Sequence, residues 1–68
     1  RVALRLVERA EQRIDADPAP APDLRRARLL LRTAREAMAT GDQTRAMKRA
    51  WYAQQIIDAH DAGVDFVP

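Results

Sequence analysis

Four regularly spaced arginines are the residues of this sequence whose side-chain chemistry points most directly to a ligand. They are Arg25, Arg28, Arg32 and Arg35. Intervals of three, four and three residues place them on one face of a helix. Guanidinium groups in a row bind phosphates and carboxylates, so this face predicts contact with nucleic acid, anionic lipid or an acidic protein partner. The alternative is a solvated face whose arginine stems cover apolar surface.

The only histidine, His60, is the next residue with distinctive chemistry. Asp58 and Asp61 lie beside it in the sequence, and all three could ligate a metal ion. One helix end supplies too few converging ligands for such a site, however, and a histidine near a helix C-terminus is favoured by the helix dipole alone. We therefore expect no metal ion and no other cofactor.

The sequence offers no combination of residues suited to catalysis. It contains neither Cys nor Ser, and its threonine and tyrosine hydroxyls have no evident base partner. Two glycines are too few for a phosphate-binding loop. A chain of this size is also expected to lack a ligand pocket of roughly 300–1,000 Å³. We predict a protein that is not an enzyme.

Three helices are predicted to position these residues, which gives an all-α fold. They cover about residues 2–15, 23–39 and 43–61. In each helix, apolar residues recur at helical spacing and form one buried face. The predicted faces are Ala3, Leu6, Val7, Ala10 and Ile14 in the first helix, Leu24, Ala27, Leu30, Leu31, Ala34, Ala37 and Met38 in the second, and Ala46, Ala50, Ala53 and Ile57 in the third.

The two connections differ in character. Residues 17–22 alternate proline with small residues, which favours an extended, semi-rigid linker. The other connection is short: Gly41 suits the left-handed end of one helix, and Asp42 suits the start of the next. The last two helices should therefore form an antiparallel hairpin over residues 23–61 with alanines at the contact. The first helix, within residues 1–16, should pack across this hairpin or exchange with a neighbouring chain.

The predicted hairpin resembles a single degenerate tetratricopeptide-like repeat over residues 24–57. The matching residues are Ala34 and Ala37, then Gly41 and Asp42 at the turn, then Ala46, Met47, Ala50 and Ala53. Two features depart from the repeat: Ala37 and Ala50 occupy its usual aromatic positions, and its terminal proline is missing. One repeat also cannot form the concave groove of a stacked array. The resemblance implies a binding scaffold without chemistry of its own.

Length and composition limit the other possibilities. Residues 1–68 suffice for one small domain, whose core is marginal at this size. Cysteine is absent, and 12 basic residues against 10 acidic ones leave a net charge of only +2. No apolar run approaches the roughly 20 residues that span a bilayer, so no transmembrane segment is predicted. The composition is compatible with the cytoplasm and with the bacterial envelope.

Large apolar side chains outside the predicted core are the candidates for a protein interface. They are Leu29, Trp51, Tyr52, Phe66 and Val67, the last two in an apolar tail over residues 62–68. We expect Trp51 and Tyr52 to point to different sides of the third helix. The predicted function is a non-enzymatic interaction or structural module of a larger chain or assembly, which binds another protein or a second copy of itself. The alternative is a small polyanion-binding domain that uses the arginine row.

Overall fold

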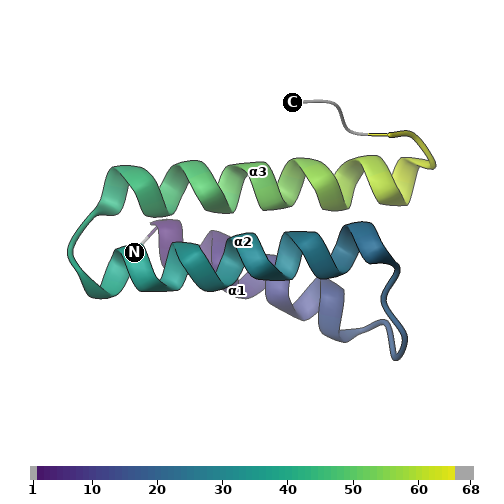
Figure 1. Ribbon diagram of the computed structural model, residues 1–68, viewed down its shortest axis with the longest axis horizontal. Coiled ribbons are helices and arrows are strands. Elements are labelled where there is room, and N and C mark those ends of the chain that lie inside the picture. The colour runs from purple at the N-terminus through teal and green to yellow at the C-terminus, as the bar shows by residue number, and fades with distance from the viewer. Residues whose placement is uncertain (1, 66–68) are drawn as a thin grey trace.

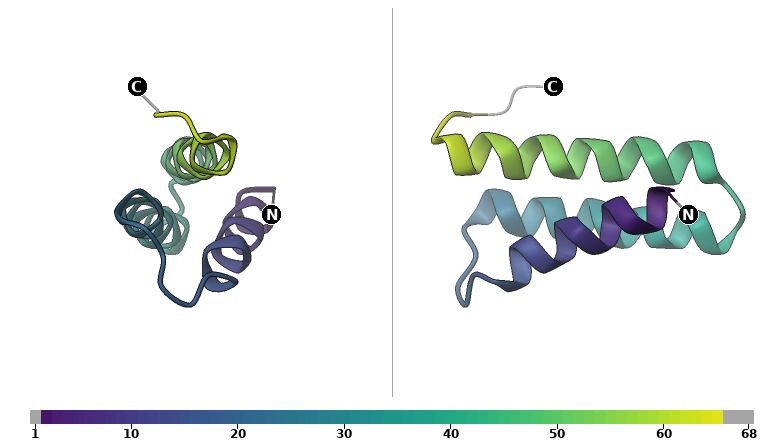
Figure 2. Two further views of the ribbon diagram at one scale, coloured as in Figure 1. Left: turned by 90° about the vertical axis from the view of Figure 1, so that its right-hand side faces the viewer. Right: turned by 180° about the vertical axis from the view of Figure 1, so that it is seen from behind.

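The computed structural model describes residues 2–65, which form three helices packed side by side (Figure 1). Helix α1 spans Val2–Asp15, α2 spans Pro22–Ala39 and α3 spans Gln43–Ala62. This confirms the predicted all-α fold, with limits that differ by one residue at the start of α2 and at the end of α3. Helices α2 and α3 run antiparallel, and α1 lies obliquely across them (Figure 2).

The reversal between α2 and α3 follows from the local chemistry of Gly41 and Asp42. Gly41 has a positive φ of 81°, and its N–H donates to the carbonyl of Met38 at 3.1 Å. The Asp42 N–H donates to the carbonyl of Ala37 at 2.8 Å, which completes a Schellman motif. The Asp42 carboxylate then caps α3 by accepting the N–H of Arg45 at 3.0 Å. The predicted hairpin is thereby confirmed.

Replacing Gly41 is expected to destabilise the turn through the backbone alone. A Cβ at this position would meet no atom within 4 Å, so the strain of a positive φ is the only cost. We expect Gly41→Ala to lower the free energy of unfolding by about 1–2 kcal/mol. Gly41→Asn is the matched control, because Asn tolerates this conformation better. In urea unfolding, the wild type should have the highest free energy of unfolding, Gly41→Asn an intermediate value and Gly41→Ala the lowest. Equal values for the two variants would contradict this account.

Small side chains fill the seam between α2 and α3. Ala27, Ala34, Ala50 and Ala53 are completely buried in the main core. Their methyl groups allow the two helix axes to approach closely, and Leu24, Leu31 and Ile57 are the largest fully buried side chains of these two helices. No polar or charged residue of the described chain is buried. The core is therefore narrow, apolar and intolerant of changes in volume.

Helix α1 closes this core from the remaining side. Val7, Ala10 and Ile14 are fully buried in the same cluster as the hairpin residues. Ala3 joins a second, smaller cluster with Ala37 and Ala46, near the hairpin turn. The helix thus packs on the hairpin of its own chain, which is one of the two arrangements predicted.

The proline-containing connection bends at residues 18–19, which corrects the prediction of a linker extended throughout, while Ala21 keeps the extended backbone that the alternating prolines predict. The Asp17 carboxylate accepts the N–H of Ala19 at 3.1 Å, and the Arg25 guanidinium donates to the carbonyl of Pro20 at 2.8 Å. The chain must reverse here because α1 and α2 run in opposite directions. An aspartate that hydrogen-bonds two residues ahead produces such a bend. Pro22 starts α2, where the missing proline N–H costs nothing.

Candidate protein interface

Two members of the predicted arginine row are bound to α1. Arg35 donates from Nε and Nη2 to the two carboxylate oxygens of Glu11, each at 2.7 Å. Arg28 donates to the Asp15 carboxylate at 2.7 Å. Both arginines therefore reach from α2 to the oblique helix α1. Their charges are therefore balanced by carboxylates of the same chain.

The remaining members of the row behave differently from each other. Arg25 donates to the Pro20 carbonyl, whereas the side chain of Arg32 has no hydrogen bond or ion pair with any residue in the range 2–65. The four arginines thus lie along α2 as their spacing predicts, but three of them contact groups of their own chain. The row is therefore a weaker phosphate-binding surface than its sequence suggests.

A further ion pair joins α1 to α3. Arg13 donates from Nε and Nη2 to both carboxylate oxygens of Asp61. Together with the pairs at Arg28 and Arg35, this contact holds α1 against both helices of the hairpin. Exposed pairs of this kind contribute little to stability because water and salt screen them, so they orient α1 more than they stabilise it.

Hydrogen bonds from arginine, from histidine and from a backbone N–H lower the pKa of three carboxyl groups. The Arg35 hydrogen bonds hold the pKa of Glu11 below its usual value, and those of Arg13 do the same for Asp61. At Asp23, desolvation raises the pKa, but hydrogen bonds from His60 and from the Leu24 N–H outweigh it and leave the pKa lowered. All three groups bind protons less readily in the folded chain than in the unfolded one.

Stability is therefore expected to fall in acid. A lowered folded-state pKa contributes stability that is present above the unfolded pKa, about 3.9 for Asp and 4.3 for Glu, and is lost as the pH falls through the folded pKa. The urea midpoint should be flat from pH 7 to about pH 5 and should decline below that. Glu11→Gln should be less stable at pH 7 and should lose less on acidification. Parallel pH profiles for the variant and the wild type would contradict this role of Glu11.

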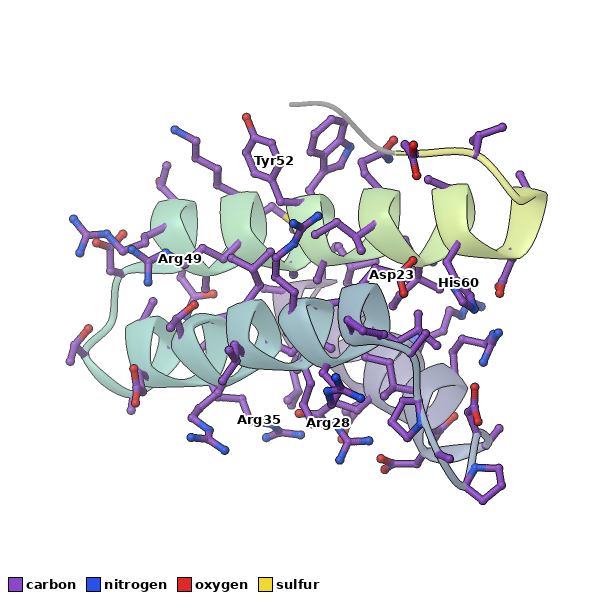
Figure 3. All side chains as sticks on the ribbon, turned by 45° about the vertical axis from the view of Figure 1, so that its right-hand side comes forward. Asp23, Arg28, Arg35, Arg49, Tyr52 and His60 are labelled. Carbon is purple, nitrogen blue, oxygen red and sulfur yellow. The ribbon has the colours of Figure 1, made fainter. Side chains whose placement is uncertain are left out.

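His60 has a partner that its sequence neighbours did not indicate. Its Nδ1 lies 2.9 Å from Oδ2 of Asp23, so the pair connects the end of α3 to the start of α2 (Figure 3). Asp61 is paired with Arg13, and Asp58 accepts a hydrogen bond from Gln54. Within residues 2–65, no group of three or more metal-ligating side chains is placed to hold an ion.

The described apolar interface candidates lie on two helices. Leu29 on α2 is 56% exposed, and Trp51 on α3 is 49% exposed. Tyr52 is half-buried, and its ring meets the Trp51 ring edge to face, with centroids 5.2 Å apart and an interplanar angle of 84°. The expectation that these two aromatics diverge is therefore wrong, because long side chains on successive residues can lean together. Phe66 and Val67 lie outside the described residues.

Trp51 borders a shallow apolar hollow on the N-terminal half of α3. The hollow has a volume of about 550 Å³ and is lined by Gln43, Thr44, Met47, Lys48 and Trp51. Met47 is partly buried against the small cluster of Ala3, Ala37 and Ala46. Exposed apolar surface beside a half-exposed tryptophan is typical of a protein contact site.

A second hollow adjoins it in the groove between α2 and α3. It has a volume of about 650 Å³ and is lined by Leu30, Asp42, Thr44, Arg45, Lys48, Arg49 and Tyr52. Sequence reasoning missed the three cations in this groove, although Lys48 and Arg49 lie one helical turn before Tyr52 and Arg45 lies two turns before it. The prediction that so short a chain lacks hollows of this volume is also wrong, because the helix pairs leave open grooves between their axes.

Comparisons with family models, with curated proteins and with solved structures find no match to this chain. None of the helices within residues 2–65 is both long and apolar enough to cross a membrane.

Proposed function

We propose that this chain is a non-enzymatic interaction module, part of a larger chain or assembly, that binds another protein through the N-terminal half of α3. The observation that carries the proposal is the half-exposed Trp51 at the edge of an apolar hollow with Met47. Tryptophan side chains in such positions supply a large share of binding energy at protein interfaces. Buried polar networks typical of an active site are absent from residues 2–65.

The architecture supports this function. Residues 2–65 measure 34 × 25 × 17 Å, so a single helix face is a substantial part of the surface. Helix α3 is held on one side by α2 and on another by α1, which keeps its outer face rigid. A rigid face loses little entropy on binding. The resemblance of residues 24–57 to a tetratricopeptide-like hairpin is consistent with a scaffold of this kind.

Site-specific photo-cross-linking in the producing cells tests the proposal. A photoreactive amino acid replaces Thr44, which lines both hollows, and in a control chain it replaces Gln12, an exposed residue of α1. We expect a discrete protein adduct from position 44 and none from position 12. Adding Trp51→Ala should weaken binding by about 30-fold, the equivalent of about 2 kcal/mol, and remove the adduct.

Two controls make the outcome decisive. Circular dichroism should show that Trp51→Ala remains folded, because half of that side chain is already exposed. Leu29→Ala removes an exposed apolar side chain of α2 that lines neither hollow and should leave the adduct unchanged. Equal cross-linking from positions 44 and 12, or an adduct indifferent to Trp51, would overturn the proposal.

A further inference from the structure

The groove between α2 and α3 carries a net positive charge. Arg45, Lys48 and Arg49 line it, and Asp42 is the one carboxylate among its described lining residues. Within residues 2–65, Lys48 and Arg49 have no ion-pair partner, in contrast to Arg28 and Arg35 on the other side of α2. The groove therefore holds cationic charge that no carboxylate among the described residues pairs with at Lys48 or Arg49.

Asp42 neutralises little of this charge. Its Oδ1 accepts the N–H of Arg45 as the cap of α3, and its Oδ2 lies 3.5 Å from the Arg45 Nε. The ion-pair contact is long, and the carboxylate is already committed to the helix end. A smaller adjoining hollow of about 200 Å³ is also lined by Arg45 and Arg49, together with Glu36 and Asp42. Three cations against two carboxylates leave the combined surface positive.

Apolar groups lie among these cations. Leu30 and Tyr52 line the same groove, and Thr44 and Lys48 are shared with the hollow beside Trp51. The two hollows thus form one continuous surface with an apolar part and a basic part. A matching ligand needs carboxylates and apolar side chains within a short length, which is the chemistry of an acidic protein segment.

The same observations disfavour nucleic acid as the occupant. Tight polyanion binding requires many neutralised phosphates over an extended basic surface. Here Arg28 and Arg35 of the neighbouring helix are occupied by Asp15 and Glu11. Three cations around Leu30 suit a few carboxylates better than a long phosphate backbone.

We infer that the groove of Arg45, Lys48 and Arg49 binds an acidic, leucine-containing segment of the partner protein. This inference rests on the proposed function and gives the chemistry of the partner: carboxylates contact the three cations, and an apolar side chain packs on Leu30 and Tyr52. Trp51 lies next to this groove, because Thr44 and Lys48 line both the groove and the hollow that Trp51 borders. Binding should weaken as salt is added, because the cations are exposed to solvent.

Titration with defined peptides tests the inference. The probe is a short peptide of paired glutamates separated by single leucines, and the matched control has Gln at every Glu position. Trp51 fluorescence and the backbone amide shifts of residues 44–52 report binding. We expect saturable binding of the Glu peptide only, and a loss of at least about tenfold in affinity when Lys48 and Arg49 are both changed to Glu.

Arg32→Glu is the matched variant, since it alters charge on an exposed face of α2 outside the groove. The loss of peptide affinity caused by Arg32→Glu should be less than about a third of the loss caused by Lys48→Glu. Three results would overturn the inference: no response to the Glu peptide at millimolar concentration, equal losses from Arg32→Glu and Lys48→Glu, or tighter binding of an oligonucleotide or of anionic vesicles than of the peptide.

The photo-cross-link from position 44 separates this inference from the proposed function. An adduct that requires Trp51 but survives the Lys48 and Arg49 changes leaves the interaction module standing and removes the acidic partner. Loss of the adduct in both variants supports both proposals. An adduct whose mass is that of a second copy of the chain would identify self-association and would overturn the acidic-segment inference.

Discussion

Leu31→Ala is expected to remove a large share of the stability of this protein, whereas Leu29→Ala, two residues away, should remove almost none. Leu31 is fully buried in the main core, and Leu29 is 56% exposed on the outer face of the same helix. Truncating a buried leucine costs about 2–5 kcal/mol through lost burial and the cavity left behind. A chain of this length has a free energy of unfolding of only about 3–10 kcal/mol.

Urea unfolding followed by circular dichroism measures this difference. The two variants remove the same atoms from the same helix, so propensity and chain length cancel in the comparison. Leu30→Ala, at a half-buried position between them, should fall in between. Similar midpoints for the Leu29 and Leu31 variants would show that α2 does not present the face described above.

Ala50→Leu is expected to have the second large effect, by forcing α2 and α3 apart. Ala50 is completely buried in the main core with Ala34 and Ala53, where a longer side chain has no space. Overpacking of this kind costs about 1–3 kcal/mol. Because leucine has nearly the helix propensity of alanine, the loss reports on packing alone.

Ala39→Leu provides the control for this experiment. Ala39 is exposed at the end of α2, so the same added atoms reach solvent and the unfolding midpoint should shift little. Equal losses at positions 39 and 50 would point to a local helix effect. An unchanged unfolding midpoint for Ala50→Leu would show that α2 and α3 can move apart without cost. That result would contradict the tight packing described above.

The predictions that succeeded depend on neighbouring residues. Apolar spacing placed the buried faces of the helices, so Val7, Ile14 and Leu31 are in the core as expected. Gly41 and Asp42 specified the reversal because a positive φ and a capping carboxylate act within a few residues. These are short-range effects, and a single sequence contains all the information they require.

The predictions that failed concern the partners of charged and aromatic side chains. The arginine row predicts either an outside ligand or a solvated face, and neither alternative includes the carboxylate of Glu11, which Arg35 binds from 24 positions later in the chain. His60 was weighed against its neighbouring aspartates, yet it meets Asp23 from the other end of the hairpin. Such contacts depend on the angle at which helices cross, and that angle is decided by the fit of whole faces.

The amino-acid sequence by itself determined three helices, their buried stripes and the tight antiparallel turn, because hydrogen bonding, capping and apolar periodicity operate within a turn or two of helix. The tertiary structure alone decided which cations are neutralised and which remain available. The docking of α1 brings Glu11 and Asp15 to the arginine row of α2 and leaves Lys48 and Arg49 of α3 without partners among residues 2–65. The net charge of a surface is the sum of the charges of all residues on it. Residues far apart in the sequence meet there only because the helices pack together.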